Sequence, residues 1–289
     1  MSLYEKCICF IGAGSMAEAV VRGLIGERRV QPGLITVTNR ANLARLDELG
    51  NAYGVRAARD EASRLQAVAE ADIVVLAMKP KDVAAAVAAL KPAFHPGQLI
   101  VSVIAGLSIE TIAAMLLPDM PVVRTMPNTS SMIGLGATGI SYSVDVTVRQ
   151  RELAREMFES IGVVCEVEEQ LLDIVTGVSG SGPAYIYYVM EAMIAGGVRG
   201  GLDEATARAL TLQTVRGAAE MVRQTGEEPA VLRAKVTSPN GTTQAALELM
   251  TAAGVDRSIA GAVTRAAERA GELGTEIAAS LAGNKPASQ

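Results

Sequence analysis

A glycine-rich turn near the N-terminus carries the first chemistry that the chain suggests. Gly12-Ala13-Gly14-Ser15-Met16-Ala17 has the pattern G-x-G-x-x-A and follows an apolar run that ends at Ile11. In such a turn the first glycine permits the bend, the second lets a pyrophosphate approach the backbone, and the alanine packs the helix against the strand. The amides of Ser15 and Met16 would face the anion. The turn predicts a dinucleotide site, and the alternative is a glycine turn used only for packing.

The residues after the second apolar run bear on which dinucleotide binds. An acidic residue there would bind the ribose 2′-hydroxyl and repel a 2′-phosphate. The chain instead has Thr38-Asn39-Arg40, with no carboxylate until Asp47. Asn39 can donate to a phosphate oxygen, and Arg40 can pair with its charge while covering the adenine. We therefore expect NADPH to be preferred, with NADH possible, unless Arg40 is only a solvated surface residue.

Two further glycine-rich segments stand where helices are expected to begin. In Ser179-Gly180-Ser181-Gly182-Pro183, Ser181 can cap the helix and Pro183 suits its first turn. Ser238-Pro239-Asn240-Gly241-Thr242-Thr243 precedes a helix expected over 242–253. Amides at that helix start, with two hydroxyls beside them, would bind a small carboxylate. Both segments can also be plain helix caps.

The inventory of acids, bases and metal ligands excludes several kinds of enzyme. The one histidine, His95, lies in a turn-like segment without a nucleophile elbow nearby, which argues against a Ser-His-Asp triad. Three scattered cysteines cannot form a zinc cage, so we expect no metal site. No lysine lies on the helix after Ser181-Gly182, where 3-hydroxyacid dehydrogenases carry a catalytic lysine. Hydride addition to an already protonated imine needs little general acid and suits this inventory.

Composition limits the partners and the compartment. The 289 residues are 49% hydrophobic and 20% charged, with a formal net charge of −5 and no basic block, which argues against nucleic acid. The longest apolar segment, 183–198, is interrupted by Glu191 and two glycines and is shorter than the roughly 20 residues of a membrane span. It predicts a buried helix. No signal peptide is recognisable, and two of the odd number of cysteines, Cys7 and Cys9, fall in an expected core strand, so we expect the cytoplasm.

The elements that must position these residues alternate in the first half of the chain. Short apolar runs predict strands buried on both faces, with amphipathic helices between them, which indicates a parallel sheet of βαβ units. The expected strands are 7–11, 34–38, 73–77, 99–102 and 122–126, with a further pair at 138–143 and 163–167, and the helices include 16–26, 83–90 and 109–117. An irregular α/β domain without cofactor is the alternative.

The second half is alanine-rich and predicts helices over 171–178, 182–197, 203–225, 229–236, 242–253 and 256–282. The fold class is therefore α/β, with a Rossmann-type dinucleotide-binding domain over 1–166 and an all-α dimerisation and substrate-binding domain over 167–289. Helices that are apolar on more than one face predict at least a homodimer. We expect the tail from Gly283 to be frayed.

Five motifs together closely resemble the pyrroline-5-carboxylate reductase family over nearly the whole chain. They are Phe10-Ile11-Gly12-Ala13-Gly14-Ser15-Met16-Ala17-Glu18, Ala77-Met78-Lys79-Pro80, Arg124-Thr125-Met126-Pro127-Asn128-Thr129, Gly177-Val178-Ser179-Gly180-Ser181-Gly182-Pro183-Ala184-Tyr185, and Val236-Thr237-Ser238-Pro239 through Gly241-Thr242-Thr243. The last two are far more specific than the dinucleotide turn.

The resemblance implies reduction of 1-pyrroline-5-carboxylate to L-proline with NADPH, the last step of proline biosynthesis, in the cytoplasm. It implies dimers with interwoven helical domains, often assembled into decamers. Catalysis would involve Thr243. Cofactor contacts would come from Ile11 to Met16, Asn39, Arg40, Ala77, Met78, Lys79, Pro80, Ala105, Gly106 and Asn128. Substrate contacts would come from Glu169, Ser181, Gly182, Ser238, Gly241, Thr242 and Thr243.

The chain departs from the family pattern at three positions. Asn240 replaces the first glycine of a Gly-Gly pair, although asparagine tolerates positive φ better than most residues. Ser130 follows Asn-Thr where a proline is common. Asp60 replaces a frequent cofactor-contacting asparagine, and an unpaired carboxylate there would repel a phosphate. A reductase of another cyclic imine or small oxo acid, and a nucleotide sensor without catalysis, stay open as alternatives.

Overall fold

The computed structural model describes residues 2–283, with side chains up to residue 280. The chain forms two compact units, one made of the residues up to Gly180 with the stretch from Arg265, the other of Ser181–Thr264. The predicted domain boundary after residue 166 stays a prediction. The tail expected to fray begins inside a helix at Gly283 and otherwise lies outside the described residues.

The first unit is built on an eight-stranded sheet in the order β3-β2-β1-β4-β5-β6-β7-β8. Its strands are β1 (Ile8–Ile11), β2 (Ile35–Thr38), β3 (Arg56–Ala58), β4 (Ile73–Leu76), β5 (Leu99–Ser102), β6 (Val122–Met126), β7 (Gly136–Tyr142) and β8 (Gly162–Glu166). Neighbours are parallel except β6 and β7, which are antiparallel. The order of the first six strands is that of the doubly wound dinucleotide-binding fold, so the predicted fold class is confirmed.

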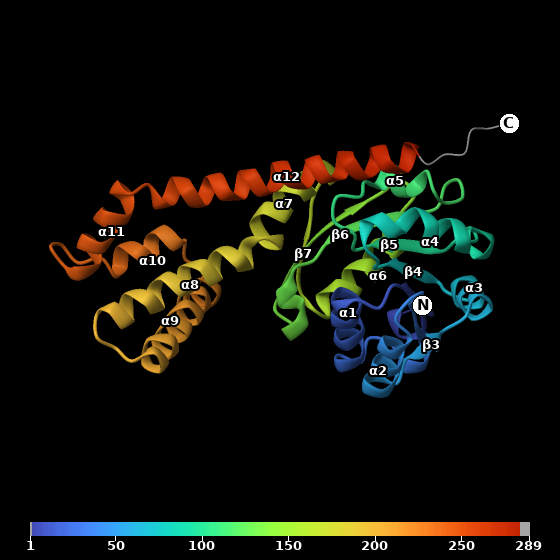
Figure 1. The fold of residues 1–289 in the computed structure, drawn as a ribbon, viewed down its shortest axis with the longest axis horizontal. Helices are drawn as coiled ribbons and strands as arrows, with labels where there is room; N and C mark the ends of the chain where they lie inside the picture. Colours follow the sequence, from blue (N-terminus) through green and yellow to red (C-terminus); the bar gives the residue numbers. More distant parts are fainter. Residues whose placement is uncertain (1, 284–289) are drawn as a thin grey trace. The chain divides into compact units, whose positions relative to one another are not determined.

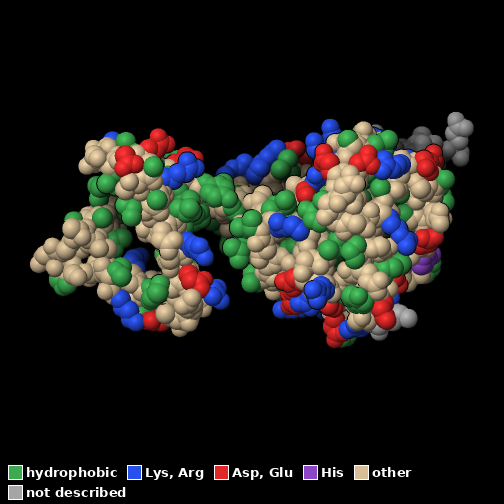
Figure 2. All heavy atoms as spheres, turned by 90° about the horizontal axis from the view of Figure 1, so that it is seen from below, with side chains coloured by type: hydrophobic (Ala, Val, Ile, Leu, Met, Phe, Trp, Pro, Cys, Tyr) green, Lys and Arg blue, Asp and Glu red, His purple; other side chains and the backbone are tan. Residues whose placement is uncertain are grey.

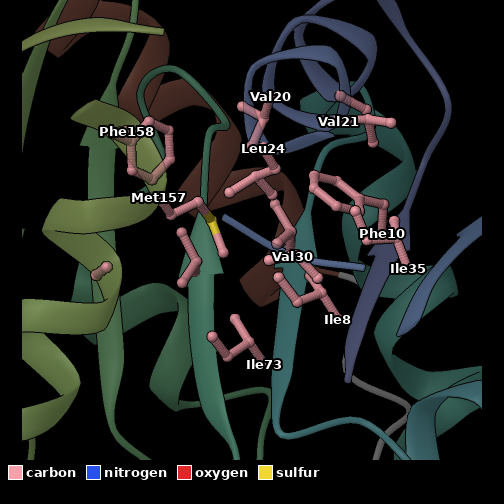
Figure 3. Close-up of a cluster of buried hydrophobic side chains, with 14 of the residues drawn as sticks. Ile8, Phe10, Val20, Val21, Leu24, Val30, Ile35, Ile73, Met157 and Phe158 are labelled. Atoms are coloured by element: carbon pink, nitrogen blue, oxygen red, sulfur yellow. The ribbon is translucent and has the colours of Figure 1, made fainter. Parts of the chain in front are cut away.

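Helices cover both faces of the sheet (Figure 1). They are α1 (Ser15–Gly26), α2 (Leu43–Tyr53), α3 (Glu61–Ala69), α4 (Val83–Leu90), α5 (Ile109–Ala113), α6 (Val148–Glu159), α7 (Leu172–Val175) and the C-terminal part of α12 (Val255–Gly283). One apolar layer joins α1, α2 and α6 to the sheet, and Figure 3 shows Leu24 and Phe158 among its side chains. The other joins α3, α4 and α5 to the opposite face.

Several elements differ from the sequence-based expectation. The strand expected from Cys7 begins at Ile8. α5 ends at Ala113 rather than at residue 117, because Met115 and Leu116 donate to carbonyls three residues back and tighten the last turn. The helix expected over 171–178 is a short α7 followed by a π-helix over Thr176–Gly180. α6 was not among the expected helices, although Thr147 and Gln150 form a capping box at its start.

The second unit is entirely helical. It contains α8 (Gly182–Arg199), α9 (Glu204–Thr225), α10 (Pro229–Lys235), α11 (Thr242–Ala252) and the first part of α12. The expectation that α8 is buried is wrong for the single chain, because none of its residues is buried when it packs mainly on α9. In the part of the chain that the structure describes, no helix combines the length and apolarity needed to span a bilayer.

Candidate functional site

The β1–α1 turn has the geometry of a phosphate-binding loop. Gly12 has φ +111°, donates its amide to the Thr38 carbonyl at 3.1 Å, and would place a Cβ 2.4 Å from the Ala77 carbonyl oxygen. Only glycine fits there without moving the backbone. Gly14 is the N-cap of α1 and is exposed, and no described atom beyond its chain neighbours would lie within 4 Å of its Cβ. The turn therefore offers accessible backbone amides at the positive end of α1, with unoccupied space beside them. This arrangement suits a pyrophosphate.

The sheet brings the predicted cofactor-binding segments together at one edge, which is formed by the carboxyl ends of its parallel strands. β1 is parallel to β2 and β4, with Ile11 paired to Thr38 and Leu76, and β4 is parallel to β5. Asn39-Arg40, 77–80 and 105–106 follow β2, β4 and β5, so they leave the sheet at the same edge as the glycine turn. This edge at the reversal of strand order is where α/β sheets bind their ligands.

Asn39 and Arg40 are placed to meet a charged group. The side-chain oxygen Oδ1 of Asn39 accepts from the backbone amides of Ala41 and Asn42, both at 3.0 Å. This turn fixes the side chain and leaves its NH₂ group to donate. Arg40 is exposed. The pair can therefore offer an amide donor and a guanidinium to one phosphate.

Side chains of α1 and α2 form a hydrogen-bonded group that holds the glycine turn, and no sequence motif had indicated it. Arg45 Nε donates to the Ala13 carbonyl at 3.1 Å, and the same guanidinium forms an ion pair with Glu18. Tyr53 donates to Glu18 at 3.0 Å. Burial raises the pKa of the Glu18 carboxyl, but the hydrogen bonds from Arg45 and Tyr53 and the charge of Arg45 outweigh it, so the net pKa is lowered.

Asp60 is not an unpaired carboxylate. The expectation that an unpaired charge at this position would repel a phosphate is therefore corrected. It is the N-cap of α3 and accepts from the Ser63 amide at 2.8 Å in a capping box. The backbone hydrogen bond from Ser63, then its hydroxyl, lowers the pKa of Asp60. The capping-box pattern Asp-x-x-Ser could have indicated this role from sequence.

Asn128 connects three segments of the first unit. Its Nδ2 donates to the Ser179 carbonyl of the π-helix at 3.0 Å, and its Oδ1 accepts from the Ala137 amide of β7 at 3.2 Å. The side chain is therefore engaged with backbone. Its predicted cofactor contact stays a prediction.

Glu169 is held by a cluster of charged groups. Its Oε1 accepts from the Ile109 amide at 2.7 Å and from Arg124 at 3.1 Å, and Arg124 also pairs with Asp173 at 3.3 Å. Arg124 is 9% exposed, whereas the Glu169 side chain is 32% exposed. Glu169 thus links β6 to the segment after β5 and keeps Oε2 available for a ligand.

The second unit holds the other predicted substrate residues. Ser181 is the N-cap of α8, as predicted, although its side chain makes no capping hydrogen bond in the described chain. Its φ and ψ are near-helical, unlike the extended conformation that lets a cap side chain reach the helix amides. Gly182 starts the helix, with Pro183 in its first turn.

The start of α11 is open to an anion. Gly241 is its N-cap, and no side chain of the described residues caps it. Asn240 has φ +59°, and its backbone amide donates to Gln244 Oε1 at 2.8 Å. The residue thus adopts the left-handed conformation, which asparagine tolerates better than most residues. Thr242 is exposed and Thr243 is half-buried, with Ser238 one turn before. Gly241 rather than Thr243 occupies the capping position.

Comparisons with known proteins cover both parts of the chain. A family model described as pyrroline-5-carboxylate reductase dimerisation matches residues 169–273, and one described as NADP oxidoreductase, coenzyme F420-dependent, matches residues 7–106. Pyrroline-5-carboxylate reductase 1 of Bacillus spizizenii is 43% identical over 273 residues, 94% of this chain and 91% of that protein. The Pseudomonas aeruginosa pyrroline-5-carboxylate reductase is 40% identical over 93% of this chain and 97% of its own.

Solved structures agree with the sequence comparisons. A pyrroline-5-carboxylate reductase from Coxiella burnetii superposes with a TM-score of 0.87 at 37% identity, covering 93% of this chain and 98% of that one. A pyrroline carboxylate reductase from Plasmodium falciparum with NADP bound gives 0.83 at 25% identity, covering 94% and 99%. With an identity above two fifths over nearly its whole length, the chain belongs to the pyrroline-5-carboxylate reductase family.

Proposed function

We propose that this protein reduces 1-pyrroline-5-carboxylate to L-proline by hydride transfer from NADPH, as the last step of proline biosynthesis. The observation that carries the proposal is the 43% identity, over 94% of the chain, to pyrroline-5-carboxylate reductase 1 of Bacillus spizizenii. The open glycine turn supports it independently, because it suits the pyrophosphate of the hydride donor.

We infer that the first unit binds the cofactor along the edge described above. Bound NADPH supplies the hydride. Gly12, Gly14 and the first amides of α1 hold the pyrophosphate, with Ile11 and Ala13 to Met16 around it. Asn39 and Arg40 bind the 2′-phosphate and favour NADPH over NADH. The remaining contacts come from Ala77, Met78, Lys79, Pro80, Ala105, Gly106 and Asn128.

The substrate residues have distinct tasks in this proposal. The amides at the start of α11 bind the carboxylate, with Gly241, Thr242 and Ser238 around it. Thr243 accepts a hydrogen bond from the iminium N–H. Hydride addition gives the neutral amine directly, and the hydroxyl can then pass a proton from solvent to that nitrogen. The cationic C=N carbon accepts hydride without a strong acid, so the site only has to orient the ring and exclude water. Glu169, Ser181 and Gly182 complete the contacts.

We also propose self-association and a cytoplasmic location. The match to a dimerisation family and the exposed apolar side chains of the helical unit support a homodimer, with a decamer as the next level of assembly. The three free cysteines support a reducing compartment.

The test is oxidation of NADPH by the purified protein when pyrroline-5-carboxylate is added, with the product identified as L-proline by chromatography. We expect turnover that depends on both reactants. If another cyclic imine or a small oxo acid is reduced much faster, the substrate assignment is wrong. If NADPH binds tightly but no such substrate is reduced, the protein is a nucleotide sensor.

A further inference from the structure

The C-terminal part of α12 touches the segment that follows β5, backbone against backbone. A Cβ on Gly274 would lie 2.6 Å from the Gly106 carbonyl oxygen, and a Cβ on Gly106 would lie 3.3 Å from the Gly274 nitrogen. Two main chains approach this closely only when both positions lack a side chain. Both residues belong to the first unit, where the end of α12 lies beside α5 (Figure 1).

The contact is firmly held on both sides. Ile277, one turn after Gly274, packs against the apolar layer that contains Ile104 and Leu107. The segment itself is anchored because both of those side chains are buried and the Ile109 amide donates to Glu169. A methyl group added at Gly274 would therefore clash with the Gly106 backbone, which the buried neighbouring side chains hold in place. The clash can be relieved only by shifting the helix or the loop.

The loop that would shift is one of the proposed cofactor contacts. Ala105 is exposed at the edge of the sheet, and Gly106 has φ +75°. β5 lies beyond β4 as seen from β1, whereas Asn39 and Arg40 follow β2 on the other side of the glycine turn. The loop and the proposed 2′-phosphate site thus lie on opposite sides of the pyrophosphate position. In the proposed cofactor site, a shift of the loop would reach the nicotinamide half and leave the adenosine half in place.

We propose that Gly274 is a positioning residue, whose missing side chain sets the position of Ala105-Gly106 and thereby of the nicotinamide half of the cofactor. This inference rests on the proposed use of NADPH. It assigns to α12 a task in the cofactor site besides its part in the helical unit.

The test compares the binding of two ligands to the full chain by titration calorimetry. NADPH contains both halves of the cofactor, whereas adenosine 2′,5′-bisphosphate contains only the adenosine half. In Gly274→Ala we expect about ten-fold weaker NADPH binding and unchanged bisphosphate binding. We also expect kcat to fall, because a misplaced nicotinamide leaves the reactive geometry.

Gly271→Ala is the matched control, one turn earlier on the same helix. Its Cβ would meet only the Asp173 carboxylate, at 3.3 Å, and a side-chain end can move aside. We expect wild-type affinity for both ligands. Should Gly274→Ala fail to fold, Ile277→Val tests the same contact by loosening the helix, and we expect it too to weaken NADPH binding alone.

Equal affinity of Gly274→Ala and wild type for NADPH would overturn the proposal. So would a parallel loss of both ligands, which would indicate general disruption. Failure of the proposed cofactor use is distinguishable, because the wild type itself would then bind neither ligand, and the premise of this inference would fall with it. A wrong substrate assignment would leave both binding measurements unchanged.

Discussion

At the scale of single residues, the proposed function gives the Thr243 hydroxyl a task separate from the α11 backbone. A hydrogen bond from a cationic N–H is worth about 1.5–3 kcal/mol, or roughly 10- to 150-fold in rate if it is fully expressed in the transition state. Thr243→Ala should lower turnover by such a factor while a proline-like carboxylate inhibitor binds almost as before, because the amides of α11 remain. Steady-state rates and inhibition constants measure the two effects.

Thr243→Ser is the control for that prediction. It keeps the hydroxyl and should retain much of the activity. If Thr243→Ala turns over at the wild-type rate and only melts at a lower temperature, Thr243 merely stabilises the helix start and its catalytic role must be withdrawn.

Arg40 governs the choice of cofactor in the proposed function. Its exposed guanidinium can pair with a 2′-phosphate that NADH lacks. Arg40→Asp should therefore raise the Michaelis constant for NADPH strongly, about ten-fold or more for a lost charge-assisted contact, and change that for NADH little. A similar rise for both cofactors would contradict this assignment.

At the scale of elements, α1 and α2 are joined beneath the glycine turn by Glu18, Arg45 and Tyr53. The pKa of Glu18 is lowered below its ordinary value of 4.5. A lowered carboxyl pKa means that the ionised form stabilises the fold, and that this contribution is present above pH 4.5 and is lost as the pH falls through the folded-state pKa. Glu18→Gln should therefore be less stable than wild type at pH 7, by about 1–2 kcal/mol.

The pH dependence is the sharper part of this prediction. The gap in stability between wild type and Glu18→Gln should narrow as the pH falls below 4.5, in thermal or urea unfolding. Glu48→Gln is the matched control, because Glu48 pairs with the same arginine at 2.9 Å but its side chain is 64% exposed. Its effect should stay within about 0.5 kcal/mol. A constant gap at all pH values would exclude the proposed role of the Glu18 charge.

At the scale of the whole molecule, the surface of the helical unit predicts assembly. Tyr187, Tyr188, Leu210, Leu212 and Leu249 are each more than half exposed in the single chain, and Figure 2 shows hydrophobic side chains on this unit. Apolar surface of this extent indicates a protein interface. We expect sedimentation to show at least a dimer of the 30.0 kDa chain, and an active monomer would refute the prediction.

A pair of charge substitutions locates that interface. Tyr188→Glu places a carboxylate on α8 and should shift the protein toward monomer with loss of activity. Val144→Glu places the same charge at a side chain of the first unit that is 96% exposed, and should leave sedimentation unchanged. Neither change disturbs a buried side chain, so both variants should fold. If both sediment as the wild type does, α8 lies outside the interface.

The sequence by itself determined the core strands, most helices and the cofactor turn. Strands buried on both faces read as continuous apolar runs, such as Ile73–Leu76, so their type follows from composition alone. The turn is a local device, in which positive φ at Gly12 and an open Gly14 belong to one short segment. The three-residue β3 was not predicted, because its run is too short to show the two-residue hydrophobic period of a strand.

Only the tertiary structure decided which distant residues support the site. Arg45 reaches Ala13, Arg124 reaches Glu169, and Gly274 lies against Gly106, yet no pattern in the chain marks these partners. The exposure of α8 likewise depends on what packs against it. The same apolar sequence pattern occurs in a helix buried within one chain and in a helix that is covered only in an oligomer. Local patterns specify backbone conformation, whereas contacts across the fold depend on strand order and helix packing, which bring together residues that the sequence separates.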